Sequence, residues 1–177
     1  MTETVQNVPS AVTLGSGATL LNAPIPSSAN VGVYLIVRAG SRDESREIAG
    51  LAHYLEHLFF KGTKRRPTAL GISREFDALG AVTNAYTDTE EVAYYTEGPA
   101  ESLVELADII TDLLSHPLFE AEEVERERNV VLQELSARLM NPGVWIGDHL
   151  HSVAFGGGSA DGLDRGRSRA RDRTCDA

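Results

Sequence analysis

The chain has 177 residues, 42% of them hydrophobic, which is enough for one domain with a buried core. Its formal net charge of −10 argues against a nucleic-acid-binding surface. The single cysteine, Cys175, excludes a disulfide framework and a cysteine zinc site. No segment approaches the roughly 18 uninterrupted apolar residues of a membrane span. The first 30 residues contain neither Arg nor Lys. We therefore expect a cytoplasmic protein without a signal peptide or a mitochondrial presequence.

The first half of the chain contains strand and helix patterns in turn. Residues 17–26 and 30–41 are rich in Val, Leu and Ile and are bounded by Gly, Pro and Asn, which predicts two strands. Residues 46–62 have helical spacing and end at a glycine. Residues 68–80 predict a shorter helix that also stops at a glycine.

The second half of the chain repeats this order. Residues 81–98 predict two strands around an acidic turn, and residues 100–117 predict an amphipathic helix. Residues 120–143 predict a longer helix with an acidic start, where the helix dipole favours negative charge. Strands and helices that follow each other in groups predict an α+β fold, with a largely antiparallel sheet and helices on one side.

The composition changes abruptly after Phe155. Residues 156–177 contain one Leu and no other large apolar residue, and they alternate Arg with Asp, Ser and Gly. Such a segment cannot bury enough apolar surface to offset its ordering entropy. We therefore expect a domain over residues 1–155 and a flexible tail over residues 156–177. Two interpretations stay open: a natural tail, or the product of a high-GC gene translated out of frame.

The stretch GLAHYLEHLFFKGT contains two of the five histidines of the chain. On a helix from Ile48 to Phe60, His53, Glu56 and His57 lie together on the side opposite an apolar stripe. The two histidines are one turn apart, so both rings can reach one metal ion. A carboxylate beside them can take a proton from the water of that ion. A surface helix with an ordinary polar face is the competing interpretation.

A catalytic zinc site usually has three protein ligands and one open position, so the two histidines need a third partner. Glu127 and Glu134 are the candidates, because they lie two helical turns apart on a face that borders an apolar stripe. His149 and His151 are two residues apart and point to different helix faces, so we do not expect them to be ligands.

Several segments together resemble a known family. His53-x-x-Glu56-His57 has the H-x-x-E-H order of the inverzincin peptidases. The chain resembles the pitrilysin-type M16 metallopeptidases, particularly the β-subunit of the mitochondrial processing peptidase and its bacterial relatives. In that family a zinc-ligand glutamate follows the second histidine after roughly 76 residues. Here 76 residues separate His57 from Glu134. The resemblance covers residues 12–155 through the segments AGSRDE, HLFFKGTKRRP, GAVTNAYTDTEEVAYY, ERERNVVLQEL and GDHLHSVAF.

The resemblance implies a complete set of metal-site residues. His53, His57 and Glu134 would hold Zn²⁺, and Glu56 would be the general base that activates the attacking water. Glu127 would contact a zinc ligand without binding the ion, and would thereby orient that ligand or tune the site.

The resemblance also implies a substrate and an architecture. Asn84 and Ala85 match an edge strand that binds the substrate backbone in this family by strand addition. The expected partner is a peptide or an unfolded protein, with no nucleic acid and no membrane, and a homodimer or heterodimer stays open. The expected fold is the N-terminal M16 domain in an incomplete form, because family members continue beyond HLHSVAF into further helices and a second half that closes the site.

Two functions from different classes follow. The first is a zinc-dependent metalloendopeptidase, catalytically weak or inert in this chain because part of the domain is missing. The second is a non-catalytic M16-like subunit or remnant that acts by protein association. Two histidines and two glutamates in the required pattern favour the first, since a structural subunit has no physical need of them.

Overall fold

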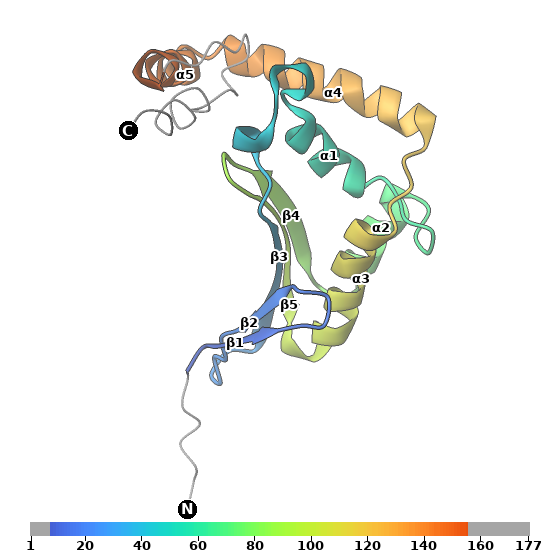
Figure 1. Cartoon of the computed structure of the whole chain (residues 1–177). Helices are drawn as coiled ribbons and strands as arrows, with labels where there is room; N and C mark the ends of the chain where they lie inside the picture. The colour runs from blue at the N-terminus through green and yellow to red at the C-terminus, as the bar shows by residue number, and fades with distance from the viewer. Residues whose placement is uncertain (1–7, 156–177) are drawn as a thin grey trace, which may run out of the picture.

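A computed structural model of the chain describes residues 8–155, and Figure 1 shows its layers. The larger sheet is antiparallel with the order β3-β5-β4, formed by Asn30–Val37, Val92–Pro99 and Val82–Thr87. A separate antiparallel hairpin pairs β1 (Ser10–Thr13) with β2 (Thr19–Asn22). The predicted α+β fold with a largely antiparallel sheet is confirmed. Strand β1 is an addition, because it precedes the first strand predicted from the sequence.

The helices α1 (Leu51–Phe59), α2 (Ala69–Ala78) and α3 (Leu103–Ser115) cover one face of the larger sheet, as predicted (Figure 1). The long helix α4 (Ala121–Leu139) crosses over α1, and α5 (Pro142–Phe155) follows it. Short 3₁₀ turns occur at Ser41–Asp43, Arg46–Ile48 and Ala100–Ser102. The predicted tail over residues 156–177 lies outside the described residues, so the domain boundary at 155 stays a prediction.

The core lies between the larger sheet and the helices α2 and α3. Leu106, Ile109, Ile110 and Leu113 recur at helical spacing on α3, and none of them is more than 2% exposed. Burying one such side chain stabilises the fold by roughly 1.5–3 kcal/mol. The remaining buried hydrophobic residues packed in the two core clusters are Ile72, Phe76, Ala81, Val92 and Tyr94. This core holds the sheet and helices that position the candidate site.

The start of α1 differs from the helix predicted from Ile48 onward. Ile48 lies in a 3₁₀ turn, and Gly50 breaks the pattern with a φ of +91°, in the left-handed region that favours glycine. The Glu44 carboxylate then accepts hydrogen bonds from the backbone N–H of Gly50 (2.8 Å) and of Ala52 (2.6 Å). A carboxylate is stabilising there because the first N–H groups of a helix lack partners and carry a partial positive charge.

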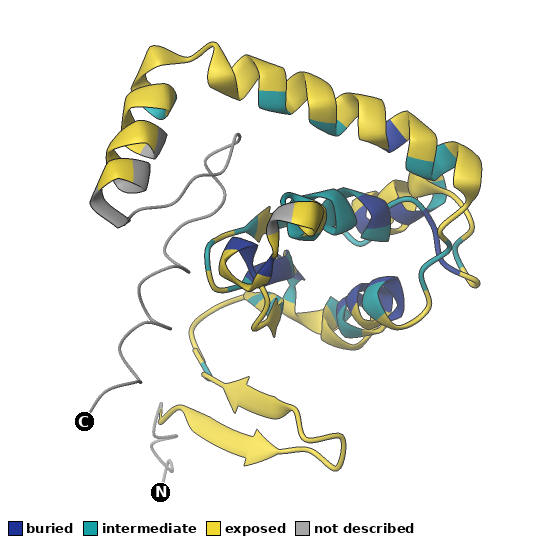
Figure 2. Cartoon of the chain, turned by 45° about the horizontal axis from the view of Figure 1, so that its top comes forward, coloured by how far each residue is buried: buried dark blue, intermediate teal, exposed yellow. Residues whose placement is uncertain are grey.

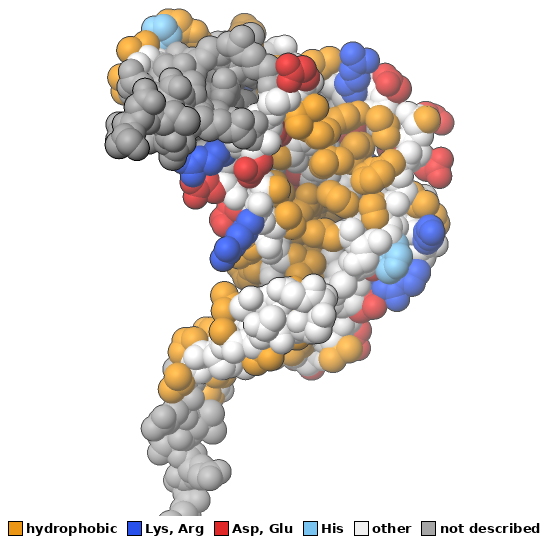
Figure 3. Space-filling view, viewed as in Figure 1, with side chains coloured by type: hydrophobic (Ala, Val, Ile, Leu, Met, Phe, Trp, Pro, Cys, Tyr) orange, Lys and Arg blue, Asp and Glu red, His pale blue; other side chains and the backbone are white. Residues whose placement is uncertain are grey.

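The helix α4 is mostly exposed, and so is α5 (Figure 2). Glu127 is the one buried residue on α4, and its carboxylate contacts His57 of α1. Hydrophobic side chains gather on the face of the helical layer shown in Figure 3.

Among the described residues, no helix is both long and apolar enough to cross a membrane.

Candidate metal centre

The helices α1 and α4 bring three potential ligand atoms together. His53 Nε2 and His57 Nε2 lie 3.2 Å apart on successive turns of α1. Glu134 reaches them from α4, with its Oε2 at 3.6 Å from His53 Nε2 and 3.4 Å from His57 Nε2. The structure thus places side by side the three residues that the sequence analysis proposed as metal ligands.

The chemistry and spacing of these atoms fit zinc. Zinc binds imidazole nitrogen and carboxylate oxygen at about 2.0–2.2 Å in a tetrahedron, which puts neighbouring ligand atoms about 3.3 Å apart. The observed separations run from 3.2 to 3.6 Å. His149 lies elsewhere, stacked on Trp145 of α5. Among the side chains that the structure describes, this is the one group of His, Cys, Asp and Glu with that arrangement.

His57 is oriented by a buried carboxylate on α4. Its Nδ1 lies 2.8 Å from Oε1 of Glu127, whose other oxygen lies 2.6 Å from the Lys61 ammonium. Burial raises the pKa of Glu127, but the hydrogen bonds from Lys61 and His57 outweigh burial and lower it. Glu127 therefore accepts the proton of Nδ1–H as a carboxylate, and the Nε2 lone pair of His57 points to the other ligand atoms.

Glu56 lies beside the three ligands. Its Oε2 accepts a hydrogen bond from the hydroxyl of Thr87, at the end of β4. Glu56 and Thr87 line the same cavity, about 630 Å³ in volume, as His53 and Glu134. The proposed base and two of the three proposed ligands therefore face a common space.

Three residues that the sequence analysis did not single out support this arrangement. Glu44 caps α1 and so fixes the start of the helix that carries both histidines. The Tyr54 hydroxyl donates to the backbone oxygen of Val124, which ties α1 to α4. Lys61 neutralises the buried carboxylate behind His57. The sequence contained no signal for these contacts, because the partners of Tyr54 and Lys61 lie on another helix far along the chain.

The basic segment after α1 is tied down by acidic side chains of α3. Arg66 pairs with Asp108 (2.9 Å) and Asp112 (2.8 Å), and Arg65 pairs with the same two carboxylates. Asp112 also accepts a hydrogen bond from Thr63 at 2.6 Å. The arginines therefore anchor the loop after α1 to the core.

Asn84 and Ala85 lie on β4, at the edge of the larger sheet. The N–H of Ala85 donates to the side-chain oxygen of Asn84 at 2.9 Å, so it points out of the sheet edge. An extended peptide that pairs with this edge would replace the Asn84 side chain with a backbone carbonyl.

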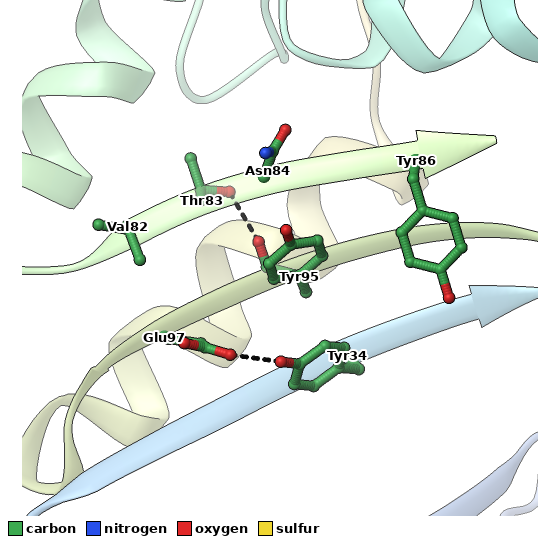
Figure 4. Close-up of a pocket in the computed structure, with 7 residues that line it drawn as sticks. All are labelled: Tyr34, Val82, Thr83, Asn84, Tyr86, Tyr95 and Glu97. Carbon is green, nitrogen blue, oxygen red and sulfur yellow. Dashed lines mark hydrogen bonds between the residues drawn. The ribbon is translucent and has the colours of Figure 1, made fainter.

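A second hollow, about 490 Å³ in volume, lies on the face of the sheet opposite the helices (Figure 4). The rings of Tyr34 and Tyr95 stack there with centroids 5.1 Å apart, and the Tyr34 hydroxyl donates to Glu97. Val33 and Leu35, the neighbours of Tyr34 on β3, pack against the core on the other face of the sheet. None of His53, His57 and Glu134 lines this hollow.

Comparison with known proteins places the chain in a family. The sequence profile of the insulinase family, peptidase family M16, matches residues 20–162, which include all the residues of the candidate centre. The chain belongs to peptidase family M16. Its H-x-x-E-H stretch and Glu134, which form the candidate metal centre, both lie within the matched residues.

Curated relatives of this M16 chain are larger proteins. A zinc protease of Rickettsia bellii is 37% identical over 142 residues, which are 80% of this chain and 34% of the relative. The β-subunit of the mitochondrial-processing peptidase of Saccharomyces cerevisiae is 35% identical over 142 residues, which are 80% of this chain and 30% of that protein. This chain spans about a third of the length of the relatives that it matches.

A solved structure shares the M16 fold described above. The crystal structure of a protease from Helicobacter pylori superposes with a TM-score of 0.71 and 26% sequence identity. The match covers 75% of this chain and 32% of that protein.

Proposed function

We propose that this chain carries the zinc-binding and proton-transfer residues of a metallopeptidase that hydrolyses internal peptide bonds. One observation carries the proposal: His53, His57 and Glu134 hold three ligand atoms at the spacing of a zinc tetrahedron, and Glu56 lies in the same cavity. A site with three protein ligands and one open position is typical of catalytic rather than structural zinc.

The protein residues have separate tasks in this proposal. Bound zinc supplies a Lewis acid that polarises the scissile carbonyl and lowers the pKa of water. His57 stays oriented because Glu127 accepts its Nδ1 proton. Glu56 takes a proton from the attacking water and delivers it to the leaving amine, so no covalent bond forms between enzyme and substrate.

The substrate in this proposal is a peptide or an unfolded protein segment. The cavity opens beside β4, whose edge carries the outward N–H of Ala85. An extended peptide added to this edge passes close to Glu56, because Thr87 of the same strand contacts that carboxylate. Cytoplasmic location stays a prediction.

The experiment measures zinc content and peptide hydrolysis on the same preparation of the full chain. We expect one zinc per chain and weak cleavage of an unstructured peptide, which a chelator abolishes and added zinc restores. Glu56→Gln should keep the zinc and lose turnover, whereas Glu125→Gln, exposed on α4, should keep both. Loss of zinc in Glu56→Gln would make Glu56 a ligand and overturn its assignment as base.

A second candidate is a non-catalytic subunit. The observation in its favour is the group of exposed apolar side chains on α5, Trp145, Ile146, Leu150 and Val153, which suits association with another protein surface. Zinc-independent assembly of the chain, without hydrolysis at any zinc concentration, would favour this candidate over the first.

A further inference from the structure

We infer that Thr87 is a positioning residue that aims Glu56 at the attacking water, an inference that rests on the proposed function. The Thr87 hydroxyl donates to Oε2 of Glu56, across 31 residues of sequence. In the described part of the chain, Thr87 is the one residue whose side chain or backbone bonds the Glu56 carboxylate. One carboxylate oxygen is thus held by the protein, and Oε1 is left for the water.

Thr87 is itself held firmly by the backbone. It is the last residue of β4 and pairs with Val92 of the central strand. The turn that follows is closed by a hydrogen bond from Asp88 N–H to the oxygen of Glu91 at 2.8 Å. The N–H of Ser41 also donates to the oxygen of Asp88, at 3.1 Å. The backbone of Thr87 is therefore fixed, so its hydroxyl can hold the longer side chain of Glu56 in place.

Glu56 needs such support because of its own flexibility. A glutamate side chain has three rotatable bonds, and a base on an open helix face would spend much of its time turned away from the water. Misplacing a reacting group by about 1 Å can lower the rate about a hundredfold. The hydrogen bond from Thr87 restricts the carboxylate without taking up its second oxygen.

The contact also joins base and substrate to one strand. Ala85, whose N–H points out of the sheet edge, lies two residues before Thr87 on β4. A peptide paired with that edge and the carboxylate of Glu56 are then both fixed relative to β4. This gives Thr87 a role in the alignment of the scissile bond with the base.

The test compares Thr87→Val, which removes the hydroxyl, with Thr87→Ser, which keeps it, in the zinc-loaded full chain. Thr83→Val is the matched control, because Thr83 lies on the same face of β4 and donates to the oxygen of Tyr95 at 3.0 Å, away from Glu56. We expect Thr87→Val to lower kcat about tenfold to a hundredfold with KM and zinc affinity unchanged. Thr87→Ser should recover most of the rate, and Thr83→Val should keep it.

A double-mutant cycle on the metal-free chain gives a readout that does not depend on activity. Thr87→Val should lower Tm in the wild-type background and have little further effect when Glu56→Ala is present, whereas Thr83→Val should act additively with Glu56→Ala. Additive Tm changes for Thr87 and Glu56 would overturn the inference, and so would full kcat, or lost zinc affinity, in Thr87→Val. If the wild-type chain binds no zinc, the proposed function fails; if it binds zinc but shows no hydrolysis, the cycle alone decides the inference.

Discussion

His57 and Glu127 face each other across the interface of α1 and α4, with Nδ1 and Oε1 2.8 Å apart, although they are 70 positions apart in the sequence. The carboxylate is 5% exposed and is also paired with Lys61. Burying a carboxylate is costly unless it is paired and hydrogen-bonded. Glu127 therefore stays bonded to His57 and holds the imidazole ring in one orientation. This pair links the packing of α4 to the geometry of the candidate metal centre.

Removing the carboxylate behind His57 should weaken the metal site. We expect Glu127→Ala to lower zinc affinity 10–100-fold, because the ring of His57 loses the acceptor that fixes its orientation and tautomer. Competition with a chromogenic chelator measures the affinity. Glu125→Ala, exposed two residues earlier on α4, is the control and should bind zinc as the wild type does. Equal affinity in Glu127→Ala and the control would show that Glu127 does not support the site.

The cap on α1 should contribute measurably to stability. Glu44→Ala leaves the N–H groups of Gly50 and Ala52 without their carboxylate partner, and we expect the free energy of unfolding to fall by about 2 kcal/mol. Urea denaturation of the metal-free chain gives this value. Glu105→Ala removes an exposed glutamate from the first turn of α3 and should cost less than about 1 kcal/mol. Similar losses in both variants would contradict a specific cap.

Asp112 should make the fold sensitive to acid. Burial opposes its ionisation, but hydrogen bonds from Thr63, Arg66 and Arg65 outweigh burial and lower the pKa of Asp112 from 3.8 to about 2. His116 also lies against the carboxylate, at 3.1 Å. A carboxyl with a lowered folded-state pKa stabilises the fold above its unfolded pKa, and this contribution is lost as pH falls from about 4 toward 2. The shift corresponds to about 2 kcal/mol.

Asp112→Asn isolates that contribution. Between pH 5 and pH 2, the free energy of unfolding of the wild type should fall by about 2 kcal/mol more than that of the variant, so the two converge in acid. Urea denaturation at both pH values measures the difference. The exposed Asp77→Asn serves as the control and should follow the wild type. A constant gap between wild type and Asp112→Asn would contradict the prediction.

Zinc should also dock the second half of α4. Beyond Glu127 this helix has no buried residue in the described structure, and the side chain of Glu134 is 49% exposed. At free zinc about 100-fold above Kd, we expect stabilisation by about 2.7 kcal/mol and slower amide hydrogen exchange over residues 128–139. Glu134→Gln should abolish both effects, because a neutral amide is a poor zinc ligand. Unchanged exchange in zinc-saturated wild type would show that α4 is already docked without the metal.

The sequence by itself determined most of the elements and most of the candidate metal centre. Helical spacing places His53, Glu56 and His57 on one face of α1 whatever the rest of the fold does, because they lie within about one turn of one another. Glu134 was found by the spacing typical of the family rather than by a physical pattern. A run rich in Val, Leu and Ile between turn residues likewise predicted β3, and the two strands expected around an acidic turn are β4 and β5.

Only the tertiary structure decided where α1 begins and what holds its side chains. The helix starts after Gly50 because a positive φ and the Glu44 carboxylate end the preceding turn, and helical periodicity does not report either feature. The contacts of Glu56 with Thr87 and of Lys61 with Glu127 join residues far apart in the sequence. Such pairs depend on the path of the chain around the core, which no local pattern of residues contains.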